Sequence, residues 1–370
     1  MKNKVSYAYI ASFLILLILP TIVFGLFGQY FDQTNYEKRE AAERPKFSLS
    51  TISSFPAAYE SYYNDRIPFR NQLIELKSLS DYYLFKQSPS KSVVLGSDGW
   101  LFYETNKEQQ NPINDYLGVT EMTEEELKRC ADNLMGINDS LKQKGKEFVL
   151  MIAPNKECIY GSKYMPSKYE VKRENTQSDI LVDYLKKNTD INVVYPKDEI
   201  FKAINQLPQY DLYYKTDTHW NGLGAFVGFK ELLKAIDVEL PSLDNLQISK
   251  VDGYAGDLTG MMGLSKYMDY DSHYAVSGFP VGEGAKLVKN EDSRDNYLVY
   301  TNTGMDERRI CVLRDSYTTA MTDYIASQFN EAHLIHRLYY KPEMLDAVNP
   351  DVVILQIVER DVIVLLDFVL

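Results

Sequence analysis

An acid and an imidazole stand one residue apart near the middle of the chain, within residues 213–222. Asp217 and His219 flank a threonine, and Trp220 follows directly. At this spacing the carboxylate can accept a hydrogen bond from one ring nitrogen and fix the tautomer, which leaves the other nitrogen free as a base. A capping acid beside a hydrogen-bonded histidine, or half of a metal site, would use the same two residues. The other three histidines show no spacing that supplies further ligands, so we predict no metal.

Ser316 is the best candidate for the group that such a base would deprotonate. The apolar run 310–313 predicts a buried strand, and it leads into Arg314-Asp315-Ser316-Tyr317. A serine where a strand turns into a helix exposes its hydroxyl, and the amides that follow can bind an oxyanion. Asp-Ser before a helix is also typical of a plain N-cap. Because each motif falls at the expected edge of a different α/β unit, we predict a catalytic triad of Asp217, His219 and Ser316.

Alternating helices and strands are expected to position these motifs. The region 123–144 predicts a capped helix with Gly145 as its stop, and 147–152 is a nearly unbroken apolar strand of the kind buried in parallel sheets. A tight turn at Asp98-Gly99 predicts a β-hairpin that ends in residues 100–102. Further helices are expected at 176–188, 198–206, 222–236 and 317–329, and further strands at 191–195, 309–313, 332–336 and 352–356. This alternation predicts a mostly parallel sheet covered on both faces.

Two segments beside the predicted sheet are expected to face the substrate. Asn155 and Lys156 follow the strand 147–152 at a carboxyl edge, where α/β sheets place ligands, so we predict that they supply oxyanion donors or substrate contacts. A Pro-Asn turn with a solvated lysine is the alternative. Residues 241–307 break the alternation with many glycines and short β-like runs, and they predict a β-rich insertion.

The chain has 29 tyrosines, and several aromatic residues cluster near the predicted triad. Aromatic rings with an exposed face stack on sugar rings, whereas most tyrosines pack in the core with the hydroxyl at the surface. Tyr214, Trp220 and Tyr317 are therefore candidate carbohydrate contacts, with ordinary packing as the alternative.

Residues 5–27 contain no charged side chain, and as a helix they would be about 34 Å long, enough to cross the ~30 Å hydrocarbon core of a bilayer. Lys2 and Lys4 precede this run, which puts the N-terminus in the cytoplasm and the remainder outside. We predict a transmembrane anchor over 1–28, a polar stalk over 29–56 and a catalytic domain over 57–370. A cleaved signal peptide is the alternative.

Composition narrows the classes of partner. With 370 residues, 45% of them hydrophobic, the chain can bury a sizeable core. A formal charge of −12 argues against a nucleic-acid partner, which requires clustered Lys and Arg, and makes an anionic polymer a poor partner without a local basic groove. Three cysteines leave at least one unpaired and exclude a disulfide scaffold. Cys311, inside an apolar strand, is expected to be a small core residue.

Five motifs together resemble a known family. They are Asn64-Asp65-Arg66-Ile67-Pro68-Phe69-Arg70-Asn71, Gly96-Ser97-Asp98-Gly99-Trp100-Leu101-Phe102-Tyr103, Ala153-Pro154-Asn155-Lys156, the stretch from Lys215 to Trp220, and the stretch from Leu313 to Tyr317. In these motifs the chain is similar to the DHHW family and its relatives, the alginate-type O-acetyltransferases with an SGNH-hydrolase-like domain. The resemblance covers nearly all of the chain after the membrane segment.

The resemblance implies an α/β fold of the SGNH-hydrolase-like (flavodoxin-like) kind, a parallel sheet sandwiched by helices. It places the family's triad on Asp217, His219 and Ser316 and implies no cofactor. One departure is Arg314, which stands where SGNH enzymes usually have glycine. A cation there changes the nucleophile turn and is a candidate ligand for an anionic group.

The implied function is extracytoplasmic O-acetylation of a cell-surface or secreted polysaccharide through an acyl-enzyme. The acyl groups would come from a partner, a multi-spanning membrane-bound O-acyltransferase. Two alternatives remain: an acetylesterase with the same triad, and a non-catalytic carbohydrate-binding protein.

Overall fold

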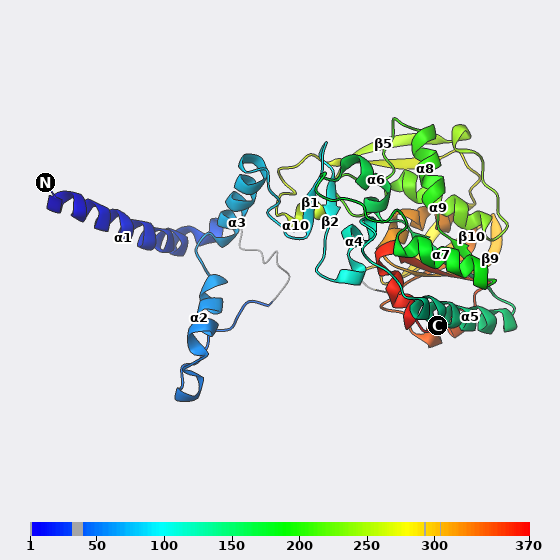
Figure 1. The fold of residues 1–370 in the computed structure, drawn as a ribbon, viewed down its shortest axis with the longest axis horizontal. Coiled ribbons are helices and arrows are strands. Elements are labelled where there is room, and N and C mark those ends of the chain that lie inside the picture. The colour runs from blue at the N-terminus through cyan, green and yellow to red at the C-terminus, as the bar shows by residue number, and fades with distance from the viewer. Residues whose placement is uncertain (1, 32–39, 292–293, 304) are drawn as a thin grey trace. The chain divides into compact units, whose positions relative to one another are not determined.

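The chain divides after Pro89 into two units, residues Met1–Pro89 and Ser90–Leu370 (Figure 1). The structure is a computed structural model and describes residues 2–31, 40–291, 294–303 and 305–370. The predicted boundaries at residues 28 and 56 stay predictions. Residues 32–39 of the predicted stalk lie outside the described residues.

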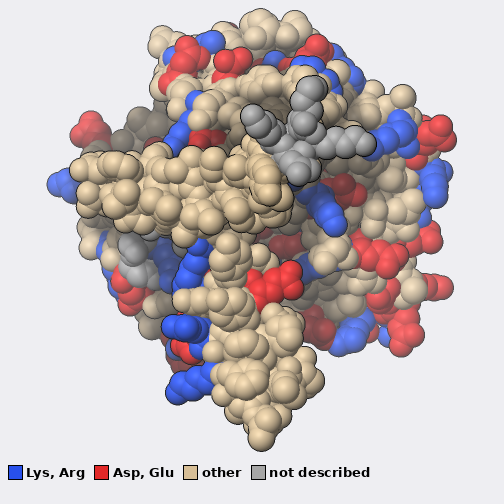
Figure 2. Space-filling view, turned by 90° about the vertical axis from the view of Figure 1, so that its left-hand side faces the viewer, with Lys and Arg blue, Asp and Glu red and all other residues tan. Residues whose placement is uncertain are grey.

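The first unit contains three helices: α1 (Lys2–Phe27), α2 (Phe55–Asn64) and α3 (Arg70–Leu79). The segment Ser6–Tyr30 is long and apolar enough to cross a membrane, which agrees with the predicted anchor. Its uncharged surface is tan in Figure 2, whereas blue and red side chains cover much of the rest of the visible face. No described residue of this unit belongs to the hydrophobic core, whose first member along the chain is Val93.

The second unit alternates helices and strands, as predicted. Its helices are α4 (Pro112–Tyr116), α5 (Glu124–Gln143), α6 (Lys156–Tyr164), α7 (Gln177–Asn188), α8 (Lys197–Gln206), α9 (Gly222–Lys234), α10 (Asp257–Met261), α11 (Thr322–Gln328) and α12 (Pro342–Val348). Its strands are β1 (Val93–Leu95), β2 (Leu101–Tyr103), β3 (Glu147–Ala153), β4 (Asn192–Val194), β5 (Gln247–Tyr254), β6 (Asp271–Ser277), β7 (Glu283–Asn290), β8 (Tyr297–Thr303), β9 (Asp306–Arg314), β10 (Phe329–His336) and β11 (Val352–Val358).

The central sheet has seven strands in the order β4-β3-β11-β9-β10-β8-β7. The run from β4 to β10 is parallel, as the alternation predicted. β8 and β7 join antiparallel, so the sheet is mixed rather than parallel throughout. The last strand in the sequence, β11, lies inside the sheet and pairs with β3 on one side and β9 on the other. β11 therefore ends between the segments that carry Asn155 and Ser316.

Helices pack on both faces of this sheet. Along β3, Val149 and Met151 belong to one hydrophobic cluster, whereas Phe148 and Leu150 belong to the other, because successive side chains of a strand point to opposite faces. The first cluster includes side chains of α6, α8, α9 and α11, and the second includes side chains of α5, α7 and α12. The predicted sandwich of a sheet between helices is confirmed for this unit.

The strands of residues 241–307 belong to two different sheets, and the predicted insertion stays a prediction. β7 and β8 extend the central sheet beyond β10, which covers an edge that would otherwise expose unpaired backbone groups. β5 and β6 instead form a separate two-stranded antiparallel sheet, with α10 between them in sequence. The segment with β5, α10 and β6 supplies several groups to the site described below.

Local predictions agree closely except after Ser316. Thr123 and Glu126 form the predicted capping box of α5. The single helix expected at 317–329 is instead a 3₁₀ turn, η6 (Ser316–Met321), followed by α11. The two threonines at 318 and 319 are stiff β-branched residues that disfavour an α-helical start. All three cysteines are free, and Cys311 is buried as predicted.

Candidate active site

The structure brings together Asp217, His219 and Ser316, although 97 positions separate His219 from Ser316. Ser316 Oγ lies 2.7 Å from His219 Nε2, and His219 Nδ1 lies 2.6 Å from Asp217 Oδ1. The serine side chain is exposed and the aspartate is buried. The three groups stand in the order that a nucleophile, a base and an orienting acid require.

The carboxylate of Asp217 is surrounded by donors. Its Oδ1 accepts from the His219 backbone N–H at 2.9 Å as well as from the ring, and its Oδ2 accepts from the Asp257 N–H at 2.8 Å. The Tyr254 hydroxyl also donates to Oδ2, at 3.3 Å. Burial alone would raise the pKa of Asp217, but the hydrogen bonds and charge of His219, with the Asp257 N–H, hold that pKa below its ordinary value. An ionised Asp217 keeps the proton of the imidazole on Nδ1 and leaves Nε2 facing the serine.

Residues of other segments fix the loop that carries Asp217 and His219 at Thr216. Asp271, on β6, accepts from the Thr216 N–H at 2.7 Å and from its hydroxyl at 2.6 Å. Leu258, in α10, donates its N–H to the Thr216 carbonyl at 3.1 Å. Gly256 permits this approach, since a Cβ on it would lie only 2.0 Å from the Thr216 oxygen.

Asp257 fixes the next turn of the same loop. It accepts from the Thr218 N–H at 2.9 Å and from the Thr218 hydroxyl at 2.7 Å, and its Oδ2 lies 4.0 Å from His219 Nδ1. Burial and the charge of Asp217 raise the pKa of Asp257 above its ordinary value. The imidazole therefore faces one hydrogen-bonded carboxylate and a second one at longer range.

Asp217, His219 and Asp257 offer ligand atoms within 4.8 Å of one another, a spacing that a metal ion would also use. The carboxylate oxygens of both acids already accept hydrogen bonds from N–H and O–H groups. A cation would have to displace these donors, so the donor set fits a hydrogen-bonded relay better than a metal centre.

Lys156 is buried and its ammonium is paired with backbone carbonyls, which contradicts its predicted role in binding a substrate. Its side chain is fully buried, and Nζ donates to the backbone carbonyls of Asp217 at 2.5 Å and of Tyr214 and Lys215 at 3.2 Å each. The same ammonium lies 5.6 Å from the Phe102 ring centroid. Burial lowers the pKa of Lys156. The sequence places this lysine next to the site, but its function in the structure is to hold the backbone of the catalytic loop.

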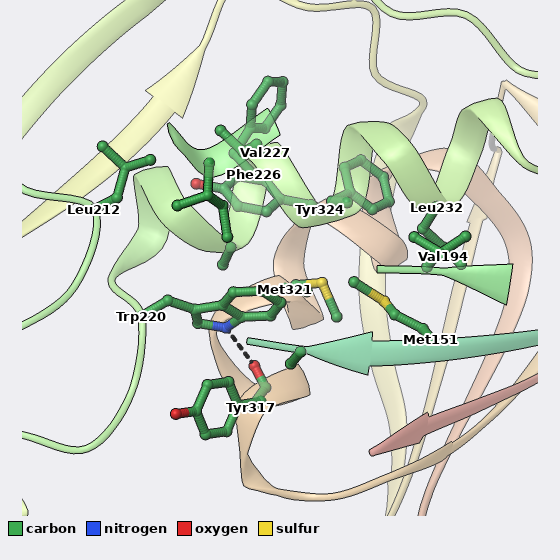
Figure 3. Close-up of a cluster of buried hydrophobic side chains, with 14 of the residues drawn as sticks. Met151, Val194, Leu212, Trp220, Phe226, Val227, Leu232, Tyr317, Met321 and Tyr324 are labelled. Atoms are coloured by element: carbon green, nitrogen blue, oxygen red, sulfur yellow. Dashed lines mark hydrogen bonds between the residues drawn. The ribbon is translucent and has the colours of Figure 1, made fainter. Parts of the chain in front are cut away.

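The aromatic residues proposed as carbohydrate contacts are also buried. Trp220 and Tyr317 are 0% exposed and Tyr214 is 4% exposed, so none offers a free ring face to a sugar. Figure 3 shows Trp220 inside a hydrophobic cluster together with Met151 and Met321. A ring that a core already covers cannot stack on a ligand, and we assign these residues to packing.

Trp220 and Tyr317 nevertheless join the two halves of the site. The Trp220 indole N–H donates to the Tyr317 carbonyl at 2.8 Å, the dashed line in Figure 3. In return, the Tyr317 hydroxyl donates to the Thr218 carbonyl at 2.6 Å. The Tyr317 ring also packs against the His219 ring, with centroids 4.8 Å apart. The segment with the base and the segment with the nucleophile are therefore tied at three places.

The Ser316 turn is held by its own aspartate. Asp315 Oδ1 accepts from the Tyr317 N–H at 2.9 Å, and Oδ2 accepts from the Val358 N–H at the end of β11 at 2.6 Å. The side chain of Gln356, inside β11, accepts from the Asp315 N–H at 3.0 Å. The amide that follows the serine is thus already paired and is not the free oxyanion donor that was expected.

The side chain of Arg314 is buried and binds backbone carbonyls of the protein itself. Its guanidinium donates to the carbonyls of Asp295 and Asp315. Burial lowers the pKa of Arg314. The cation that replaces the usual glycine anchors the backbone behind the turn, and its predicted contact with an anionic ligand was wrong.

Asn155 has one hydrogen-bond donor without a partner among the described residues. Its backbone N–H donates to Glu359 at 2.7 Å, and its side-chain oxygen accepts from Arg360 at 3.4 Å. The Asn155 side-chain nitrogen has no partner among the described residues. Arg360 in turn lies 5.5 Å from the ring centroid of Tyr317, next to the serine. Asn155 and Arg360 thus form a polar group at the carboxyl ends of β3 and β11.

Several groups of the site were missed from the sequence. Asp257, Asp271 and Tyr254 lie in the region interpreted only as an insertion. Arg360 follows β11, a strand that was predicted correctly. The rule that singled out Asn155, that ligands meet the carboxyl ends of parallel strands, would have found Arg360 as well.

Part of this chain is similar to a known protein family. Residues 93–275 match a family described as SGNH hydrolase-like domain, acetyltransferase AlgX. The matched region contains Asp217 and His219 and ends before Ser316. The probable alginate O-acetylase AlgJ of Pseudomonas putida is 25% identical over 213 residues, which are 56% of this chain and 51% of that protein. The chain thus spans about half the length of the curated relatives it matches.

Solved structures share the fold. PatB1 of Bacillus cereus covers 73% of this chain and 97% of its own, with a TM-score of 0.53 and 17% identity. A DHHW family protein from Eubacterium siraeum covers 74% of this chain and 96% of its own, with a TM-score of 0.49 and 14% identity. The predicted resemblance to alginate-type O-acetyltransferases with an SGNH hydrolase-like domain is confirmed.

Proposed function

We propose that the chain is an extracytoplasmic, membrane-anchored O-acetyltransferase that acts on a cell-surface or secreted polysaccharide. The observation that carries the proposal is the continuous hydrogen-bonded series from Asp217 through His219 to the exposed Ser316. The similarity to AlgX-type domains and to AlgJ supports acetyl transfer as the reaction.

In the first half-reaction Ser316 Oγ attacks the carbonyl carbon of the acetyl donor while His219 Nε2 takes the hydroxyl proton. The donor's leaving group departs with that proton, and Ser316 carries the acetyl ester. In the second half-reaction a hydroxyl of the glycan attacks the ester, and its proton passes to His219 and then to Ser316 Oγ. Asp217 orients the ring and stabilises its charged form throughout.

The oxyanion of each half-reaction needs donors. The Tyr317 amide is paired with Asp315. We assign this role to the side-chain nitrogen of Asn155, which is buried but, unlike the Lys156 ammonium, has no partner among the described residues, with Arg360 as its neighbour.

The membrane anchor bears on the source of acetyl groups. No soluble acetyl-CoA is expected outside the cell, and Lys2 and Lys4 favour an orientation with the second unit outside. The proposal therefore includes a partner, a multi-spanning membrane-bound O-acyltransferase that passes acyl groups across the bilayer.

Mass spectrometry of the acyl-enzyme tests the nucleophile. The purified protein, given a nitrophenyl acetate, should gain one acetyl group on the peptide that contains Asp315-Ser316-Tyr317. Ser316→Ala should lose this label at an unchanged melting temperature, because Ser316 is exposed. Thr319→Ala is the matched control, since Thr319 is an exposed hydroxyl residue of the same turn, and it should label normally.

The fate of the label separates the alternatives. A transferase discharges it faster when an acceptor glycan is added, whereas an esterase loses it to water at the same rate with or without glycan. Label that persists in Ser316→Ala would show that another residue is the nucleophile. Glycan binding without any label would support a binding protein instead.

A further inference from the structure

The helices α2 and α3 bury almost none of their side chains. α2 has no buried residue and α3 buries only Ser78. Isolated helices of about 10 residues are marginal in water, and most helices gain their stability from packing an apolar face. Large apolar side chains of this segment are instead exposed, with Leu76 at 60%, Leu84 at 72% and Phe85 at 58%. This unit needs an apolar surface that the described chain does not supply within it.

The position of these helices relative to α1 indicates what that surface is. The Phe69 ring, at the start of α3, packs on Phe24 near the end of α1 and on Phe31 just beyond it, with centroids 5.3 and 4.9 Å apart. Phe69 adopts a φ of 58°, a conformation that is rare for a bulky residue and fixes how the chain enters α3. α3 therefore begins at the level where the membrane-crossing segment ends.

The two helices do not continue the direction of α1. Figure 1 shows α2 and α3 leaving the end of α1 on opposite sides, across its axis. If α1 crosses a bilayer, helices in this arrangement lie along its surface. Aromatic residues such as Tyr63, which is exposed on α2, are enriched at that level of a membrane.

Charge agrees with this placement. Residues 1–89 contain 10 Lys and Arg against 8 Asp and Glu, whereas residues 90–370 contain 30 against 44. An anionic lipid surface repels residues 90–370, which carry an excess of negative charge, but does not repel residues 1–89. The near-neutral charge and the exposed apolar side chains are the combination expected for a segment in the headgroup region.

We propose that α2, α3 and the turn that follows them, residues 55–85, bind the lipid surface at which α1 ends. Leu73, Leu76, Leu84 and Phe85 are the side chains that enter the interfacial layer. The proposal rests on α1 being a membrane anchor, as in the proposed function, and does not depend on the acetyl-transfer chemistry. The surface would hold the beginning of the second unit close to the membrane.

Tryptophan probes quenched by brominated lipids test this in the full chain reconstituted in bilayers. The two native tryptophans, Trp100 and Trp220, are buried in the hydrophobic core and are present in every variant, which keeps the background constant. Leu73→Trp and Leu84→Trp should be quenched most by lipids brominated near the headgroup. Leu17→Trp, within α1, should be quenched most by lipids brominated deep in the chains. Leu338→Trp, exposed in the second unit, is the unquenched control.

The outcomes separate this inference from the anchor. Quenching of Leu17→Trp together with unquenched Leu73→Trp and Leu84→Trp overturns lipid binding by residues 55–85 and leaves the anchor intact. If the two unquenched probes are also shielded from aqueous iodide, protein covers the face, as a second copy or the second unit would. If Leu17→Trp itself is unquenched, α1 is not in the bilayer, and both the anchor and the inference fail. A repeat with Phe85→Trp guards against one probe disturbing its surroundings.

Discussion

The loop that carries Asp217 and His219 and the turn that carries Ser316 are positioned in different ways. The loop has no regular secondary structure and takes its shape from ionisable side chains of remote segments: Lys156 from α6, Asp271 from β6 and Asp257 from α10. The turn follows directly from β9 and is fixed by its own Asp315 and by the neighbouring strand β11.

In this molecule the central sheet positions the Ser316 turn directly, whereas side chains of other segments position the loop of Asp217 and His219. Parallel strands set the ends of β9 and β11 side by side, so a serine at such an end needs few additional contacts. The base lies on a loop, where backbone groups need side-chain partners to be satisfied away from water. Substitutions in the two regions should therefore differ in effect, and the substitutions in the loop are the most informative.

The largest expected effect is that of Asp217→Asn. An amide in place of the carboxylate favours the wrong imidazole tautomer, and the rate of acetyl transfer should fall by roughly 10⁴, by analogy with serine-protease triads. The fold should persist, since asparagine has the same shape. Initial rates and thermal melts of the variant check this. Activity close to that of the unmodified protein in both Asp217→Asn and His219→Ala would exclude the triad.

Lys156→Met should have an intermediate effect, although Lys156 touches none of the reacting atoms. The variant removes the donor to three loop carbonyls, and each buried acceptor left unpaired costs about 1–3 kcal/mol. A shift of the loop by a fraction of an ångström to 1 Å should also lower the rate by up to about 100-fold. Urea unfolding and initial rates measure the two effects.

Lys163→Met is the matched control for that experiment, since Lys163 is an exposed lysine on the same helix. Equal stability and rate for the two variants would mean that the loop keeps its shape without the buried ammonium. The contrast between the loop and the turn would then not hold.

The smallest effect is expected for Asp257→Asn and appears in the pH dependence. Its carboxylate lies 4.0 Å from His219 Nδ1 and stabilises the positive charge that the ring carries in the proposed reaction. Removing the carboxylate charge should lower the rate by about fivefold, the equivalent of about 1 kcal/mol, at a pH where Asp257 is ionised.

The sign of a second effect follows from the raised pKa of Asp257 itself. As the pH falls, Asp257 becomes protonated and neutral, like the asparagine that replaces it. The two profiles should therefore converge at the acid end. Asp252→Asn, at an exposed position of β5, should leave the profile unchanged. A rate of Asp257→Asn equal to or above that of the unmodified protein at neutral pH would contradict the assigned contact.

The helices, the strands and the candidate residues Asp217, His219 and Ser316 could be predicted from local sequence. Glu147–Ala153 is an apolar run long enough to be a buried strand, and Asn221-Gly222 caps a helix right after the Asp-x-His pair. Such signals depend on neighbours in the chain, so they can be interpreted without knowing the fold. Ser316 was found in the same way, from the end of an apolar strand.

The supporting groups depend on pairing between distant segments. Nothing near Asp257 or Asp271 in the sequence indicates that they would accept hydrogen bonds from Thr218 and Thr216, which lie 39 and 55 positions away. Lys156 was singled out, but its role depends on burial, which a single sequence does not reveal. The same holds for Trp220 and Tyr317, whose aromatic rings suit a sugar platform and a core equally well.

The reciprocal bonds between Trp220 and Tyr317 have a consequence for turnover. In the proposed mechanism acetylation would make Ser316 an ester, and the incoming alcohol would then lose its proton to the same imidazole that activated the serine. Because the indole and the phenol tie the backbones of both segments, such an ester would remain beside His219 during the exchange of donor for acceptor. One stationary base would then serve both substrates in turn, and the polymer would have to reach it.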